Sequence, residues 1–191
     1  MSIQMTLMFA PGYTSENYPG GMTTLSIDQQ IDAFEKRYKI WFLDIAQNLV
    51  NTPDSGFAVL TILNAYPELF AQLNGYQGDK LALFQQGTAN IFPDIYYRFY
   101  PDGDLITKHL YSYMRNSLAH MSFTGNDVIL SENFPAPLEV LGRNGIRVVC
   151  VNPRKWYERI QFHFERYIEA LKNPDNADLR NKFSARLNQP F

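Results

Sequence analysis

The chain has 191 residues, of which 46% are hydrophobic and 15% aromatic, so it can bury a real core, and its length favours one domain. Its formal net charge of −2 lacks the basic character of many nucleic-acid-binding proteins, so any such site has to come from local clustering of charge. The single cysteine, Cys150, excludes an internal disulfide framework and a cysteine-based zinc cluster.

No stretch of the sequence approaches the ~20 apolar residues that a membrane helix needs. The first residues also lack the basic region and long apolar run of a secretory signal. We therefore expect no membrane partner and a protein of the reducing cytoplasm, in which Cys150 is a buried thiol of a strand.

The N-terminal region, 1–23, shows no sustained period and reads as an irregular arm rich in proline and glycine. Ser26, with Gln29 three residues later, forms a capping-box pattern that starts a helix. This is the longest helix that the sequence predicts, and Thr52-Pro53 ends it. Apolar residues at helical spacing predict its buried stripe: Ile31, Phe34, Tyr38, Trp41, Ile45 and Leu49.

Further helices are predicted between Asp54 and Ile91. Apolar residues repeat at helical spacing from Asp54 to Leu73, and Pro67 should break or kink that helix. After two turn signals, Asp79 is a natural cap for a helix that runs to about Ile91. The aromatic-rich segment 94–100 is compatible with a short helix or a strand, because periodicity does not decide at that length.

The C-terminal third begins with β-branched runs at 128–130, 138–141 and 146–151. Turn residues bound these runs, which indicates a small antiparallel sheet of two or three strands. Asn152-Pro153 then caps a final helix. Beyond it the chain turns polar, and we expect 173–191 to be a loosely attached tail.

The final helix has two distinguishable sides. Its apolar stripe would bury Trp156 or Tyr157, Ile160, Phe164, Tyr167 or Ile168, and Leu171. The other side carries Lys155, Arg159, His163 and Arg166. His163, like His109, is more typical of a packing or surface histidine than of a ligand, and the three histidines of the chain have no acidic partner at metal-binding spacing. We therefore expect neither a metal nor another cofactor.

The stretch from Tyr111 to Met121 holds the densest cluster of reactive side chains. A helix capped by Asp104 would bury one apolar stripe there: Ile106, Leu110, Met114, Leu118 and Met121. On the polar side, Asn116 and His120 are neighbours four residues apart, and His109, Ser112 and Tyr113 lie near them. Arg115 lies roughly 140° further around the helix than His120, so one helix makes only part of an Arg/His pocket.

Arg115, Asn116, three intervening residues and His120 resemble the signature of the HEPN superfamily (higher eukaryotes and prokaryotes nucleotide-binding). The predicted order of elements is similar to that of bacterial members: a long first helix, two shorter ones, the motif helix, a β-hairpin and a closing amphipathic helix. The resemblance covers roughly 26–171. It implies metal-independent ribonuclease activity and a homodimer in which the motif helices face each other.

RNA cleavage without a metal needs a proton acceptor or donor and positive charge for the phosphorane oxygens. His120 can act as general base or acid, Arg115 can stabilise the growing charge, and Asn116 would orient the imidazole or bind a phosphate oxygen. Taken singly, Arg115 would be a surface arginine and His120 a residue favoured near a helix C-terminus. The combined signature favours the catalytic interpretation, with Ser112, Tyr113 and His109 as substrate-binding residues.

A basic segment between Arg143 and Arg166 could collect phosphates. The substrate-binding candidates in it are Arg154, Lys155, Arg159 and Arg166. Phe162 or Trp156, if exposed among them, would offer base stacking. The alternative is an ordinary solvated helix face with a buried Trp156. Because the net charge is slightly negative, we expect no binding to duplex DNA.

These patterns predict a mainly α-helical protein, with 24–172 as an up-and-down bundle of roughly four to five helices and a small antiparallel β-hairpin between the motif helix and the last long helix. The predicted function is metal-independent RNA cleavage at a site shared by two subunits. One alternative is a non-catalytic HEPN-like module that binds RNA, a nucleotide, or an antitoxin or other regulatory protein. The second is a helical scaffold with an unknown partner.

Overall fold

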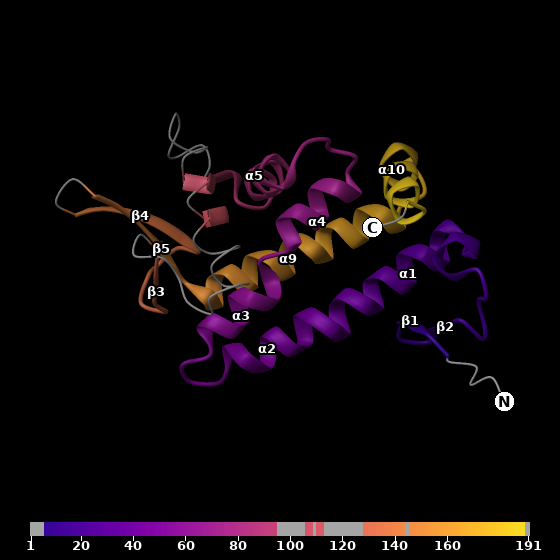
Figure 1. Cartoon of the computed structure of the whole chain (residues 1–191), viewed down its shortest axis with the longest axis horizontal. Coiled ribbons are helices and arrows are strands. Elements are labelled where there is room, and N and C mark those ends of the chain that lie inside the picture. The colour runs from indigo at the N-terminus through magenta and orange to yellow at the C-terminus, as the bar shows by residue number, and fades with distance from the viewer. Residues whose placement is uncertain (1–5, 95–105, 109, 113–127, 144–145, 190–191) are drawn as a thin grey trace.

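The structure is a computed structural model that describes residues 6–94, 106–108, 110–112, 128–143 and 146–189. Within these ranges the protein is mainly α-helical, which confirms the predicted class. Long helices form the body, a small sheet lies at one end, and helix α10 lies at the other (Figure 1). None of the helices in these ranges is both long and apolar enough to cross a membrane.

The first long helix is continuous and has three parts: α1 (Ile27–Tyr38), the π-helical turn η2 (Lys39–Leu43) and α2 (Asp44–Val50). Its N-terminus has the predicted capping box. The Ser26 hydroxyl accepts from the backbone N–H of Gln29, and the Gln29 side chain accepts from the backbone N–H of Ser26. Two backbone donors that the helix cannot pair internally are thereby satisfied.

The π-turn changes which residues of this helix are buried. The predicted stripe holds through Tyr38 but is wrong at Ile45, which is 46% exposed while Ala46 and Val50 are buried. Leu49 is only partly buried, packed against the core. A π-turn accommodates one more residue than an α-turn, so the buried positions after it move along the chain by one. Leu43, inside the turn, is also buried.

The helix predicted from Asp54 to Leu73 is broken into α3 (Gly56–Leu63) and α4 (Tyr66–Leu73), as expected from Pro67, which stands in the first turn of α4. Asp79 caps α5 (Lys80–Ile91) by accepting from the backbone N–H of Ala82 at 2.8 Å.

Helices α4 and α5 pack closely. A Cβ at Gly87 of α5 would lie 1.9 Å from the carbonyl oxygen of Pro67, so this approach requires glycine.

The sheet at the end of the body has the order β3-β5-β4 and is mixed. Strands β4 (Leu138–Arg143) and β5 (Ile146–Val151) pair antiparallel. Strand β3 (Val128–Leu130) pairs parallel with β5, so the expectation of a purely antiparallel sheet is wrong. The proline-containing loop after β3 leads past the position of β5 to β4 at the other edge of the sheet. Strand β4 runs opposite to β3, and β5 then returns between them in the direction of β3.

Asn152 fixes this loop and starts the last long helix, α9 (Pro153–Lys172). Its side-chain amide donates to the carbonyl oxygens of Glu132 (2.9 Å) and Phe134 (2.7 Å), and its Oδ1 accepts from the backbone N–H of Lys155 (3.1 Å). Asn152 is only 1% exposed. The predicted N-cap therefore also holds the loop between β3 and β4 against the start of α9.

Helix α9 runs antiparallel to the first long helix (Figure 1). Near its start, Arg154 Nη2 donates to the carbonyl oxygen of Val50, and near its end, Lys172 Nζ lies 2.5 Å from Glu35 Oε2. Between these points α9 supplies much of the core: Trp156, Tyr157, Ile160, Phe164, Tyr167, Ile168 and Leu171.

Both terminal regions are more ordered than the sequence predicts. The arm forms a hairpin, β1 (Met8–Ala10) with β2 (Tyr13–Thr14), followed by the 3-10 turn η1 (Gly21–Thr24). Tyr13 Oη donates to Asp32 of α1 at 2.7 Å.

The expectation of a loose C-terminal tail is wrong. Its residues form helix α10 (Ala177–Leu187), in which Phe183 is fully buried against Phe34 with ring centroids 5.4 Å apart. Few apolar residues mark this helix, but Phe183 inserts into the core, and Leu179 and Leu187 pack against it.

Candidate functional site

The start of the predicted motif helix lies within the described residues. Residues 106–108 are α-helical and 110–112 are π-helical, and the first two positions of the predicted apolar stripe, Ile106 and Leu110, are buried in the core. The Tyr111 ring meets the ring of Phe84 from α5, with centroids 5.5 Å apart. These contacts attach the beginning of this helix to α5 and the core, and Ser112 is half-buried there.

The catalytic candidates Arg115, Asn116 and His120 lie outside the described residues, as do the binding candidates His109 and Tyr113. The assignment of these residues to a site therefore stays a prediction. Ser112 is the candidate of this group that the structure places, six residues after the buried Ile106.

The basic candidates at the start of α9 mostly contact the protein itself. Arg154 donates to Val50 O at 2.7 Å and lies 3.5 Å from a carboxylate oxygen of Glu132. Lys155 Nζ donates to the carbonyl oxygen of Pro135 at 2.5 Å. Both cations connect α9 to the loop after β3, and Arg154 also connects it to the end of α2. Their charged groups are therefore engaged in contacts within the protein.

Further along α9 the cations differ in how far contacts within the protein already occupy them. Arg159 Nη2 donates to both carboxylate oxygens of Asp94 at 2.9 Å. Among the described residues, Arg166 makes only a long contact, 3.8 Å, with Glu169, and its side chain is 70% exposed. Trp156 is buried and stacks on Phe92, whereas Phe162 is 56% exposed. Of the aromatic candidates, only Phe162 offers a face to solvent.

His163 lies on a different side of α9 from the one that the sequence suggests. Its Nδ1 is 3.1 Å from Tyr66 Oη, and its ring meets Phe70 edge-on with centroids 4.4 Å apart. Burial, aided by the charge of Arg159, lowers the pKa of His163 from 6.5 to about 4. Burial also raises the pKa of Tyr66 well above its usual value. A neutral, half-buried imidazole is therefore paired with a phenol hydroxyl at neutral pH.

The sequence did contain a signal for this position. Trp156, Ile160, His163 and Tyr167 follow one another at spacings of four, three and four residues, which places them on one helix face. The position of His163 beside the cations of α9 is therefore not what the structure shows, whereas its interpretation as a packing histidine fits these contacts. The spacing was the better guide, since a neutral imidazole packs against aromatic rings without a large electrostatic cost.

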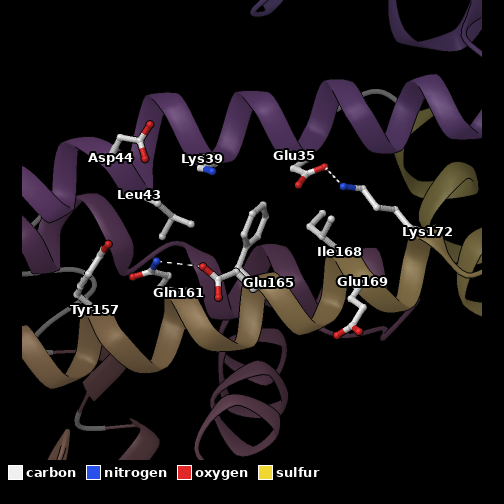
Figure 2. A pocket seen from close by; sticks show the side chains of 11 residues that line it. Glu35, Lys39, Leu43, Asp44, Tyr157, Gln161, Glu165, Ile168, Glu169 and Lys172 are labelled. Atoms are coloured by element: carbon white, nitrogen blue, oxygen red, sulfur yellow. Dashed lines mark hydrogen bonds and ion pairs between the residues drawn. The ribbon is translucent and has the colours of Figure 1, made fainter.

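A polar groove of about 330 Å³ lies between the first long helix and α9 (Figure 2). Lys172 pairs with Glu35 across it, and Gln161 donates to Glu165 at 3.0 Å. Leu43, Phe164 and Ile168 also line it. Its charged groups are partly paired with each other, so the groove is a mixed-charge surface. In the described part of the chain, no group of three or more His, Cys, Asp and Glu side chains is placed to hold a metal ion.

The fold and these contacts define a mainly helical protein with a small mixed sheet. No protein-family model matches the chain, and no curated protein or solved structure matches it either.

Proposed function

We propose that the protein is a metal-independent ribonuclease of HEPN type. The observation that carries the proposal is the Arg115-Asn116 and His120 signature, which follows a helical segment whose first apolar residues, Ile106 and Leu110, are buried in the core of a mainly helical protein. We place the polar side chains of the motif in a cleft, although the π-helical residues 110–112 move the buried positions after them away from a strict α-helical spacing.

In this proposal the substrate supplies its own nucleophile. The 2′-hydroxyl oxygen attacks the adjacent phosphorus while His120 takes its proton, and the P–O5′ bond breaks as the imidazolium formed at His120 gives that proton to the 5′-oxygen. The products are a 2′,3′-cyclic phosphate and a 5′-hydroxyl. Arg115 stabilises the phosphorane oxygens, whose negative charge grows in the transition state, and Asn116 orients the imidazole or a phosphate oxygen.

The surface of α9 would contribute unequally to RNA binding. Arg154, Lys155 and Arg159 already bond to protein oxygens, so neutralising one of them would also disturb the fold locally. Arg166 and Phe162 are exposed and would provide a phosphate contact and a stacking face. We extend the proposal to an up-and-down bundle that pairs through its motif helices as a homodimer.

The test is cleavage of a mixed RNA substrate in the presence of a chelator. We expect the wild-type protein to cut, His120→Ala and Arg115→Ala to lose activity by about 100-fold or more, and Lys80→Ala, a matched loss of one exposed cation, to cut normally. Melting temperatures of all variants should agree within a few degrees. Equal cleavage by the wild type and His120→Ala would refute the site.

A second candidate is a binding module that keeps the motif without turnover. The internal contacts of Arg154, Lys155 and Arg159 favour it, because they leave little free positive charge to collect a long RNA. RNA or nucleotide binding measured by fluorescence anisotropy, with Arg115-dependent affinity and no cleavage product, would select this function. A helical scaffold would show neither binding nor cleavage.

A further inference from the structure

An apolar pocket of about 240 Å³ lies between the first long helix and the α3–α4 pair. One wall comes from Phe34, Tyr38 and Phe42, and the other includes Tyr66 and Leu69. It is separate from the polar groove of Figure 2, although Phe34 and Tyr38 belong to the same long helix. The pocket is larger than the ~150 Å³ apolar cavity known to take up benzene, so it has room for one or two rings.

The π-turn shapes the first wall. Residues four apart in an α-helix drift around its axis by about 40° per step, which would carry a third aromatic ring off the face. Phe42 lies inside the π-turn η2, and its ring stacks on Tyr38 with centroids 5.1 Å apart and planes at 16°. Tyr38 in turn stacks with Phe34 at 6.2 Å and 29°. The π-turn thus keeps the three rings in one nearly continuous wall. Such turns occur frequently at functional sites.

The second wall meets the first where Tyr66 contacts Tyr38. Tyr66 bonds to His163 through its hydroxyl, and its ring lies 5.0 Å from that of Tyr38. Tyr38 is 4% exposed, and its hydroxyl has no hydrogen-bond partner in the part of the chain that the structure describes. Aromatic walls of this kind favour a planar ring over a flexible chain, because stacked and edge-on contacts add to the burial of apolar area.

Arg37 gives the pocket a charged rim. It belongs to the pocket lining and is exposed, and it makes no ion pair with any described residue. Its guanidinium carbon lies 5.6 Å from the ring centroid of Trp41, which orients the group without neutralising it. A carboxylate at the rim could accept two parallel hydrogen bonds from this guanidinium.

We propose that this pocket binds a planar aromatic carboxylate of one or two rings. The ring packs in the pocket against its aromatic and aliphatic lining, which includes Phe42 and Leu69, and the carboxylate pairs with Arg37 at the rim. This inference is independent of the proposed ribonuclease activity, because none of its residues belongs to the motif or to the basic segment.

The test compares 1-naphthoate with its neutral analogue 1-naphthalenemethanol by isothermal titration calorimetry on the full chain. We expect wild-type protein to bind naphthoate at least about tenfold more tightly than the alcohol, in line with a charge-assisted contact. Arg37→Gln should remove that difference and leave alcohol binding unchanged. Lys39→Gln removes a neighbouring cation that does not line the pocket, and it should preserve the difference.

A steric variant and a mapping experiment complete the test. Ala65 is an exposed lining residue, so Ala65→Phe should block both ligands without removing core packing. In NMR spectra of the wild type, naphthoate should shift the signals of Phe34, Phe42 and Leu69. Absence of binding at millimolar ligand, or shifts confined to other residues, would overturn the pocket. Equal losses in Arg37→Gln and Lys39→Gln would overturn the assignment of the carboxylate to Arg37.

Discussion

His163 shows how one neutral polar residue can fit into an aromatic core. It lies between Tyr66 and Phe70, and its Nδ1 has the Tyr66 hydroxyl as partner. Arg159, one turn earlier on α9, adds a positive charge that opposes protonation of the imidazole. The residue therefore contributes to stability as a neutral group, and acidification should weaken the fold.

The predicted pH dependence follows from the direction of this shift. The pKa of His163 falls from 6.5 to about 4 on folding, so between these values the unfolded chain binds more protons than the folded one. The free energy of unfolding should therefore decrease as the pH falls from about 6.5 to about 4, by at most on the order of 3 kcal/mol. Urea unfolding at a series of pH values would measure it.

His163→Phe serves as the control for this pH dependence. It keeps the ring contacts and removes the titrating group, so the slope between pH 6.5 and 4 should become shallower. A wild-type protein whose stability does not change across this window would mean that the imidazole is solvated.

At the residue scale, the sequence predicted local partners best. Ser26, Asp79 and Asn152 bond to backbone N–H groups three residues away, so their roles depend on the chain nearby. The loop contacts of Asn152 and the pairing of His163 with Tyr66 connect residues far apart in the chain. No local pattern specifies such partners, and the structure was needed to find them.

At the scale of elements, the π-turn is the feature that sequence periodicity missed. The apolar residues Trp41, Ile45 and Leu49 continue the spacing of α1, and an uninterrupted α-helix would bury them. Packing against α3 and α9 instead favours Leu43 and Ala46, and the extra residue is accommodated in η2. The sequence also did not predict that β3 is parallel to β5. This pairing joins residues far apart in the chain, and no local pattern specifies such a contact.

A matched pair of substitutions tests the shifted register. Leu43→Ala should lower the free energy of unfolding by about 2–5 kcal/mol, because it leaves a cavity in the core. Ile45→Ala, two residues away and 46% exposed, should change it by less than about 1 kcal/mol. Denaturant unfolding compares them directly. A larger loss for Ile45→Ala than for Leu43→Ala would indicate an uninterrupted α-helix.

At the scale of the whole molecule, α10 closes the end of the helical body opposite the sheet (Figure 1). Phe183 packs on Phe34, Arg180 donates to the carbonyl oxygen of Leu171 and to Asp28, and Arg186 donates to Gln72 of α4. The helix therefore contacts α1, α4 and α9, and we expect it to unfold together with them.

Phe183→Ala tests this cooperation. It should lower the free energy of unfolding by about 3–5 kcal/mol, as for other fully buried phenylalanines. Phe162→Ala is the matched control, because Phe162 is 56% exposed and should cost less than about 1 kcal/mol. Thermal unfolding by circular dichroism compares the two variants. Equal stability would restore the interpretation of 173–191 as a loose tail.

The proposed dimer depends on geometry that one chain cannot complete. Arg115 and His120 diverge by roughly 140° around a helix, so each subunit would present part of a pocket and its twofold partner the rest. Pairing would also bring two copies of Arg115 into one cleft, which raises the local positive charge of a chain whose net charge is −2.

Mixing two inactive variants tests the shared site. An Arg115→Ala chain paired with a His120→Ala chain has one intact composite site and one that lacks both groups. With free subunit exchange, half of the dimers are mixed, so RNA cleavage should recover to about a quarter of the wild-type rate. Exchange is checked separately by co-purification of differently tagged chains. If exchange is complete and cleavage stays at the level of either variant alone, each site draws both groups from one chain, and the dimer is not needed for catalysis.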